Sequence, residues 1–311
     1  MLLDNRQPRQ EILAGLMRDP AAIAPKFFYD TLGSRLFEAI TCLPEYYLTR
    51  IEQALMNSQL PAIANAIGRP GTLIDLGAGN CAKAPALFDA LQPRQYVAVD
   101  ISADFVAAAL NRLQTDFPDI DMLALSADLT TDFALTEAVA RERRLFFYPG
   151  SSIGNFEPHE ALALLTHVRE LCGEGSSGGG LLIGVDLVKD PQRIEAAYDD
   201  TLGITAAFNL NVLNHLNTLI GSDFDIRDWR HRAHYDSAHQ RIEMHLEALC
   251  DIEVCWPGGG RAFAQGECIH TENSHKYTAA QFGAMLTEAG FAYTHCWSDA
   301  RQWFAVFYAS L

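Results

Sequence analysis

The residues best suited to bind a small charged ligand lie in one short stretch, Asp75-Leu76-Gly77-Ala78-Gly79. The acid ends an apolar run, 72–76, that has strand character. A segment whose pattern predicts a helix, 81–91, follows the glycines. Because glycine has no Cβ, its backbone can approach a ligand closely. A strand, a glycine loop and a helix in this order are typical of nucleotide-binding α/β proteins.

The loop by itself is compatible with three interpretations. Gly77, Gly79 and Ala82 fit the G-x-G-x-x-G/A spacing of dinucleotide-binding proteins. The carboxylate of Asp75, however, would repel a pyrophosphate, whereas it suits the ammonium or the sulfonium of S-adenosylmethionine. A purely structural turn is the third interpretation. Asp75 therefore favours S-adenosylmethionine and leaves the other two open.

The elements that must position this loop are alternating strands and helices. Strands are predicted at 72–76, 95–100, 121–126, 144–149 and 180–186, and helices at 81–91, 103–115 and 158–172. Such a series predicts an α/β fold with a doubly wound parallel sheet. Ligands of these sheets bind at the carboxyl ends of the strands.

Several polar residues stand at those strand ends. Asp100 ends the second strand, where its two carboxylate oxygens could accept both hydroxyls of a ribose. Asp128 follows the third strand and could accept the adenine amino group, with Leu129 against the ring. The alternative for both acids is a helix cap. Lys83, just after the glycine loop, is either a ligand of the cofactor or a solvated helix residue.

The rest of the chain predicts a second subdomain and the end of the sheet. Residues 1–60 have helical periodicity and contain tyrosines at 29, 46 and 47, which either pack in a core or reach a ligand with their hydroxyls. Residues 191–219 predict two helices, and residues 231–274 predict antiparallel strands. A helix at 279–289 and two strands, 291–297 and 302–309, are then expected to complete the sheet as an antiparallel hairpin.

Composition excludes several classes of protein. The 311 residues carry a net charge of −16, which argues against a nucleic-acid partner, since phosphate contacts need Lys and Arg. No C-x-x-C occurs among the seven cysteines, and no run of about 18 apolar residues suggests a membrane span. These features indicate a cytoplasmic protein with no nucleic-acid or membrane partner. We also expect a monomer that acts on a small molecule.

Four histidines lie close together in the sequence: His231, His234, His239 and His245. The alternation of a strand would distribute them over both of its faces, and no cysteine supports them. We therefore expect no metal site.

Distinctive segments occur in one order along the chain. They are Phe28-Tyr29-Asp30, Gly33-Ser34, Phe37, Leu43-Pro44-Glu45-Tyr46-Tyr47, Thr49-Arg50, Asp75-Leu76-Gly77-Ala78-Gly79, Gly150-Ser151-Ser152-Ile153-Gly154-Asn155-Phe156 and Thr271-Glu272-Asn273-Ser274. Together they resemble the L-histidine Nα-methyltransferases of ergothioneine biosynthesis, from about Pro25 to the C-terminus. The least certain match is Asn80-Cys81 in the glycine loop.

The resemblance implies a Rossmann-like S-adenosylmethionine methyltransferase core at 59–188 and 277–311. An inserted α+β substrate-binding subdomain would comprise 1–58 and 189–276. It also implies the reaction, in which S-adenosylmethionine methylates the α-amino group of L-histidine to Nα,Nα,Nα-trimethyl-L-histidine (hercynine). No metal takes part in that reaction.

The resemblance further implies a role for each matching residue. Tyr29 and Tyr46 would be the catalytic residues that line the α-amino site. The substrate would be bound through its carboxylate by Asn155 and Tyr198, near the backbone of Gly154, and through its imidazole by Glu272 and Ser274, with Met244 nearby. The residues that would hold the cofactor are Asp75, Gly77, Gly79, Lys83, Asp100, Asp128 and Leu129.

Physical chemistry agrees with the imidazole assignment. Glu272 and Ser274 are two residues apart on a predicted strand, so they share a face. A carboxylate accepts one ring N–H, and a hydroxyl serves the other nitrogen as donor or acceptor. Alternatives remain open: a related N-methyltransferase for another aromatic amino acid or amine, a catalytically silent protein that binds amino acid or cofactor, and a dinucleotide oxidoreductase.

Overall fold

The computed structural model describes residues 6–101, 103–131, 133–173 and 179–311. The chain divides into two compact units. Residues 48–188 and 275–311 form what we call the sheet unit, and residues up to 47 with 189–274 form the insertion unit. Each unit is described by itself below.

The sheet unit is built on seven strands. They are β2 (Thr72–Leu76), β3 (Gln95–Asp100), β4 (Asp121–Ser126), β5 (Arg144–Tyr148), β6 (Gly180–Asp186), β12 (Tyr293–Ser298) and β13 (Phe304–Ser310). Their order in the sheet is β12-β13-β6-β5-β2-β3-β4. The pairs among β4, β3, β2, β5 and β6 are parallel, whereas β13 runs antiparallel to both β6 and β12. The predicted doubly wound sheet with its closing antiparallel hairpin is confirmed.

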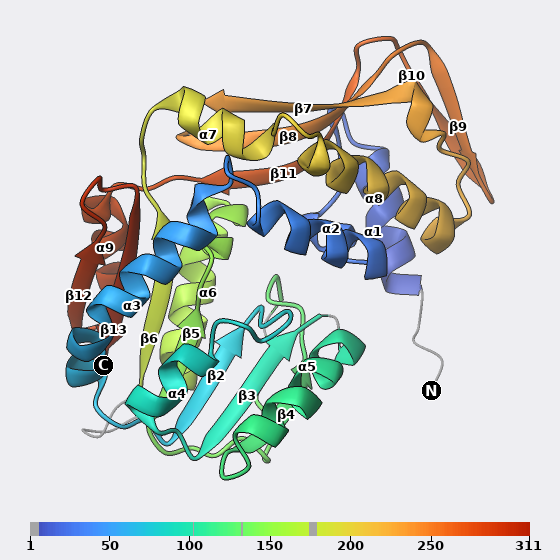
Figure 1. Cartoon of the computed structure of the whole chain (residues 1–311). Helices are drawn as coiled ribbons and strands as arrows, with labels where there is room; N and C mark the ends of the chain where they lie inside the picture. The colour runs from blue at the N-terminus through green and yellow to red at the C-terminus, as the bar shows by residue number, and fades with distance from the viewer. Residues whose placement is uncertain (1–5, 102, 132, 174–178) are drawn as a thin grey trace. The chain divides into compact units, whose positions relative to one another are not determined.

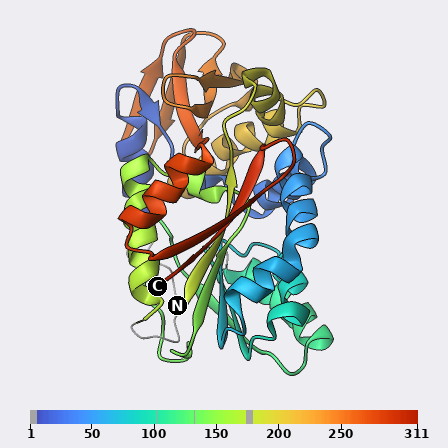
Figure 2. The same cartoon turned by 90° about the vertical axis from the view of Figure 1, so that its left-hand side faces the viewer.

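Helices cover both faces of this sheet. They are α3 (Tyr47–Ile67), α4 (Pro85–Leu91), α5 (Ala103–Asp116), α6 (Pro158–Leu171) and α9 (Ala279–Glu288). Figure 2 shows α6 and α9 on one face, and α3 and α4 on the other. Strand alternation directs Ile74 and Leu76 into the core beneath α6 and α9. The intervening Asp75 therefore points to the opposite face.

One predicted helix and one predicted boundary need correction. The helix expected at 81–91 begins only at Pro85, because Cys81 has a left-handed φ of 57° and proline is favoured in the first turn. The proposed core began at residue 59. In the structure α3 is one helix over Tyr47–Ile67, and residues 48–58 belong with the sheet unit.

The insertion unit combines helices with a four-stranded sheet of order β1-β11-β8-β7 and a β10-β9 hairpin. Its elements are α1 (Arg6–Leu16), β1 (Ala21–Ala22), η1 (Pro25–Phe28), α2 (Thr31–Thr41), α7 (Pro191–Tyr198), α8 (Ile204–Ile220), η3 (Ile226–Asp228), β7 (Trp229–Asp236), β8 (Arg241–Ala248), β9 (Ile252–Trp256), β10 (Gly259–Phe263) and β11 (Cys268–His275). In Figure 1, β8 lies between β7 and β11. The predicted helices and the three longer strands are confirmed. The sequence patterns did not predict β1, β9 or β10.

Candidate active site

The glycine loop after β2 has a backbone that favours glycine. Gly77 and Gly79 have φ of 67° and 53°, a left-handed region where a Cβ costs energy. The amides of Gly77 and Ala78 both donate to the carbonyl oxygen of Val99, at 2.8 and 3.1 Å. The amide of Gly79 donates to Oδ2 of Asp100 at 2.9 Å. The structure thus joins the glycine loop to Asp100 at the ends of adjacent strands.

Asp75 lies beneath this loop rather than on its surface. Its side chain is 1% exposed, and its Oδ2 accepts a hydrogen bond of 2.7 Å from the hydroxyl of Tyr96. Its Oδ1 is buried and has no hydrogen-bond partner among the described residues. Burial raises the pKa of Asp75 to about 7, because a charged carboxylate loses its hydration there. Asp75 is therefore a titratable group near neutral pH.

Lys83 is paired with an acid that the motifs did not reveal. Its Nζ lies 2.6 Å from Oε2 of Glu52, on α3. Glu52 is only 3% exposed and shares the buried face of α3 with Leu55, Met56 and Ile63. A single acid on the apolar face of an amphipathic helix is the sequence signal that could have identified it.

Asp128 and Leu129 follow β4 in a turn rather than at a helix cap. Oδ1 of Asp128 accepts from the amide and the hydroxyl of Thr130, at 2.9 and 2.6 Å. An acid that bonds two residues ahead in this way stabilises a turn. Leu129 packs against the core beneath α6 and α9.

The loop after β5 carries Gly154 and Asn155 within η2 (Ser152–Asn155). Ser151 precedes it with a left-handed φ of 63°, and its Oγ accepts from the amide of Asp186 at 2.8 Å. The buried Gly154 donates its amide to the carbonyl of Ser151 at 2.9 Å. Since β5 pairs in parallel with β2, this loop and the glycine loop leave the same edge of the sheet.

The insertion unit places Tyr29, Tyr46 and Tyr198 in one aromatic cluster. The ring centroids of Tyr29 and Phe37 are 5.9 Å apart, those of Phe37 and Tyr46 6.3 Å, and those of Tyr46 and Tyr198 6.4 Å. All three pairs are edge-to-face, which is a favoured geometry for aromatic rings. Phe208 of α8 joins the cluster at 5.8 Å from Tyr29. The sequence patterns assigned Phe208 only to an apolar helix face.

The predicted imidazole-binding residues are buried on β11. Glu272 is 7% exposed and Ser274 2%, while Asn273 between them is half-buried. The hydroxyl of Tyr198 donates to Oγ of Ser274 at 2.9 Å. Met244 lies on the neighbouring β8, where its carbonyl accepts from the hydroxyl of Thr271 at 3.0 Å. The structure therefore brings Tyr198, Ser274 and Tyr46 together, whereas Asn155 belongs to the sheet unit.

His231 contacts the backbone of Tyr198. Its Nε2 lies 2.8 Å from the carbonyl oxygen of Tyr198, and its Nδ1 lies 2.8 Å from Nδ2 of Asn209. Asn209 Nδ2 can only donate, so His231 is neutral, with its proton on Nε2 and directed at Tyr198. Burial also lowers the pKa of His231. Among the described residues, no group of three or more His, Cys, Asp or Glu side chains is placed to hold a metal ion.

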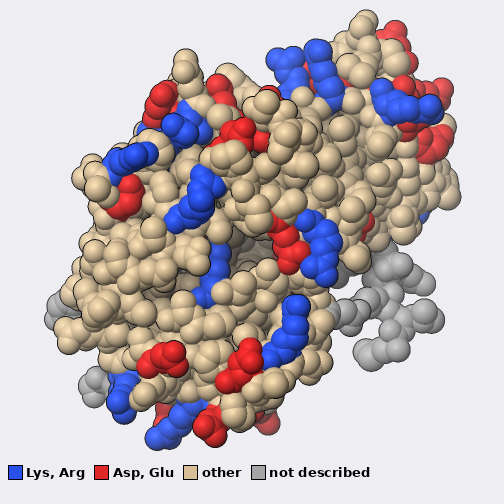
Figure 3. Space-filling view, in the orientation of Figure 1, with Lys and Arg blue, Asp and Glu red and all other residues tan. Residues whose placement is uncertain are grey.

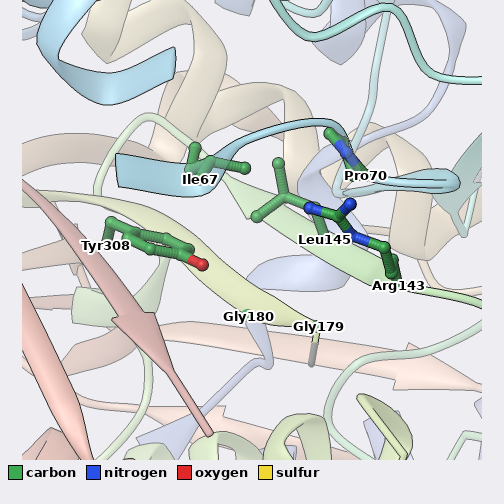
Figure 4. Close-up of a pocket in the computed structure, with 7 residues that line it drawn as sticks. All are labelled: Ile67, Pro70, Arg143, Leu145, Gly179, Gly180 and Tyr308. Carbon is green, nitrogen blue, oxygen red and sulfur yellow. The ribbon is translucent and has the colours of Figure 1, made fainter. Parts of the chain in front are cut away.

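A shallow hollow in the sheet unit is a poor candidate for the site (Figure 4). Its lining includes Ile67 at the end of α3, Leu145 near the start of β5, and Tyr308 of β13. It therefore lies at the amino ends of the parallel strands, whereas ligands of such sheets bind at the carboxyl ends.

The charged surface has a mixed character. On the face shown in Figure 3, Lys and Arg side chains stand singly or in small groups beside Asp and Glu.

In the part of the chain that the structure describes, none of the helices has the length and apolar character needed to cross a bilayer.

Comparison with known proteins identifies the family. Residues 8–311 match the model of a family described as "Histidine-specific methyltransferase, SAM-dependent". The chain is 38% identical over 304 residues to a histidine N-alpha-methyltransferase of Mycobacterium tuberculosis, covering 94% of this chain and 91% of that protein. A protein of the same name from Mycolicibacterium smegmatis is 37% identical over the same share of both chains.

Another relative matches the chain over part of its own length and at lower identity. The chain is 29% identical to ergothioneine biosynthesis protein 1 of Neurospora crassa, covering 91% of this chain and 32% of that protein. The match to the family model spans both units of the structure. The chain therefore belongs to the family of histidine-specific, S-adenosylmethionine-dependent methyltransferases.

Proposed function

We propose that the protein methylates the α-amino nitrogen of L-histidine three times, forming Nα,Nα,Nα-trimethyl-L-histidine (hercynine). The observation that carries this proposal is the buried polar pair on β11, Glu272 and Ser274, beside Tyr198 and the aromatic cluster. The family match over nearly the whole chain supports it.

The polar pair explains how an imidazole would be selected. A carboxylate accepts the N–H of one ring nitrogen, and a hydroxyl donates to or accepts from the other. An indole or an alkyl side chain would offer Glu272 and Ser274 no second ring nitrogen to bond, so the site would bind those substrates less tightly than an imidazole. In this proposal the Ser274 hydroxyl, now bonded to Tyr198, turns to the imidazole.

The sheet unit has groups that fit S-adenosylmethionine. The half-buried Asp100 suits a ribose, the φ values of Gly77 and Gly79 let the backbone approach a ligand, and Lys83 suits a carboxylate. We also assign Asp75, Asp128 and Leu129 to the cofactor site, as the resemblance implies. When bound, the cofactor would supply a methyl group attached to a positively charged sulfur. That sulfur is a good leaving group because it departs as a neutral thioether.

The substrate ammonium must lose one proton to solvent before each transfer, and beyond that the reaction requires orientation more than acid–base chemistry. We assign Tyr29 and Tyr46 to the α-amino group, with the substrate carboxylate held by Asn155 and Tyr198 near Gly154. A tyrosine hydroxyl can accept an N–H of the amine, and tyrosine faces attract the methylammonium groups that grow with each transfer. The edge-to-face contacts of Phe37 fix both rings, which favours a collinear approach of nitrogen and methyl group.

The decisive experiment is a methylation assay with purified protein, L-histidine and S-adenosylmethionine. Mass spectrometry over time should show mono-, di- and trimethylhistidine in sequence. Absence of any methylated histidine would refute the proposal. A panel of other aromatic amino acids and amines tests the alternative substrates, and light scattering after gel filtration tests the predicted monomer.

A further inference from the structure

Glu52 connects two loops of the sheet unit through one buried carboxylate. Its Oε2 lies 2.6 Å from Nζ of Lys83, in the segment after β2. Its Oε1 accepts from the amide of Gly150 at 2.7 Å, in the loop after β5. These are the loops that carry the glycines and Asn155. One side chain on α3 therefore bonds both to the segment that we assign to the cofactor and to the loop that we assign to the substrate carboxylate.

Two glycines leave space for this arrangement. A Cβ on Gly184 of β6 would lie 2.1 Å from Oε1 of Glu52, although Gly184 does not have a left-handed φ. A Cβ on Gly150, whose φ is 84°, would lie 3.0 Å from Nζ of Lys83. A Cβ at position 184 would therefore displace the Glu52 carboxylate from its present position and crowd the ring of Phe304 at 3.0 Å, with no contribution from backbone strain.

Stability alone does not account for a carboxylate in this position. Glu52 has lost most of its hydration, and the attraction of one ammonium often only offsets that loss. A well-packed apolar side chain would commonly be as stable there or more so. Glu52 and Lys83 are also close enough to Asp75 to change its pKa. The charge of Lys83 lowers that pKa, and the charge of Glu52 raises it.

We propose that Glu52 is a positioning residue that orients the Lys83 ammonium toward the carboxylate of S-adenosylmethionine. This inference rests on the proposed function. An ammonium carries three N–H donors, so one bond to Glu52 leaves two that can point at a ligand carboxylate. The Lys83 side chain is 38% exposed, and without Glu52 its long flexible stem would lose rotamer freedom only when the cofactor binds.

The substitution Glu52→Gln separates the two bonds of this carboxylate. The glutamine oxygen can still accept from Gly150, but its NH2 group cannot pair with Lys83. We expect the dissociation constant for S-adenosylmethionine, measured by calorimetry, to rise about tenfold, which corresponds to about 1.4 kcal/mol. The Michaelis constant for histidine should change less than twofold. Glu52→Asp, which restores the charge on a shorter stem, should recover part of the affinity.

A double-variant cycle tests whether Glu52 acts through Lys83. Lys83→Met should weaken cofactor binding, and adding Glu52→Gln to it should have no further effect. Glu247→Gln is the matched control, because Glu247 pairs with Arg232 at 2.7 Å in the insertion unit. This control should leave cofactor affinity unchanged. Thermal unfolding of each variant separates a loss of binding from a loss of folding.

Two results would overturn the inference. One is a Glu52→Gln protein that folds and binds the cofactor as tightly as, or more tightly than, the parent. The other is a double variant whose loss of cofactor affinity equals the product of the losses measured for Glu52→Gln and Lys83→Met separately. Failure of the proposed function would look different, because the parent protein itself would then yield no methylated histidine.

Discussion

The sheet unit and the insertion unit assemble their predicted site residues by different means. In the sheet unit, short loops at the ends of adjacent strands are held by backbone amides, such as that of Gly79 on Asp100. In the insertion unit, side chains from distant segments meet directly, as do Tyr46 with Tyr198 and Tyr198 with Ser274. One set depends on backbone shape, and the other depends on side-chain identity.

This difference predicts separable defects. Changes that disturb the glycine loop should weaken the binding of S-adenosylmethionine and leave the affinity for histidine nearly unchanged. Changes in the aromatic cluster or on β11 should do the reverse. A variant that alters both affinities equally would weaken the distinction between the two units.

The largest effect is expected for Glu272→Ala. Removing the carboxylate leaves an imidazole N–H without its acceptor, so kcat/KM for histidine should fall about a thousandfold, or about 4 kcal/mol. Calorimetry should show unchanged affinity for S-adenosylmethionine. Glu253→Ala, an exposed position on β9, is the control. Undiminished histidine turnover would remove Glu272 from imidazole recognition.

The next effect concerns pH and the sheet unit alone. Burial raises the pKa of Asp75 from 3.8 to about 7, so the folded chain binds this proton more tightly than the unfolded chain. The stabilisation is fully present below about pH 4 and is lost as pH rises through about 7. Asp75→Asn cannot ionise. The difference in free energy of unfolding between this variant and the parent should therefore shift in favour of the variant by up to about 4 kcal/mol between pH 4 and pH 8.

Urea unfolding across that pH range provides the measurement. If the difference between the two proteins is the same at both ends, Asp75 does not titrate near neutrality. Glu52, Lys83 and Asp100 also influence this carboxyl group, so Glu52→Gln should move the midpoint of the change to lower pH.

A smaller effect is expected for Gly79→Ala. A Cβ in the left-handed region costs about 1–2 kcal/mol, so the loop should shift and S-adenosylmethionine should bind about tenfold more weakly. Gly266→Ala imposes the same kind of backbone strain in the insertion unit, where φ is 85° and a Cβ meets no neighbour within 4 Å. Equal loss of cofactor affinity in both variants would show that the effect is one of general stability.

The smallest effect is expected for Tyr198→Phe. Loss of the hydroxyl that donates to Ser274 should raise the Michaelis constant for histidine about fivefold, the size of one net hydrogen bond near 1 kcal/mol. Cofactor affinity should not change. Tyr308→Phe in the sheet unit serves as control, and a histidine affinity that is the same in all three proteins would contradict the role of Tyr198.

The sequence alone specified the sheet with precision where its signals are local. Strands 72–76, 95–100, 121–126 and 180–186 coincide with β2, β3, β4 and β6. The strands β2, β3 and β6 are buried and form continuous apolar runs, whereas β4 lies at the edge of the sheet and is partly exposed. The glycine loop follows the first of these strands. The order of the motifs was also enough to indicate the family, which the comparisons then confirmed.

Only the tertiary structure could decide how distant residues pair. Nothing near Glu52 in the sequence indicates Lys83 or Gly150, since 31 and 98 residues separate them. The bond between Tyr198 and Ser274 likewise spans 76 residues. Hydrophobic periodicity fixes which face of an element is buried, but the partner of a buried polar group depends on how whole elements pack. The sequence could therefore name candidate site residues, but only the structure could supply the contacts among them.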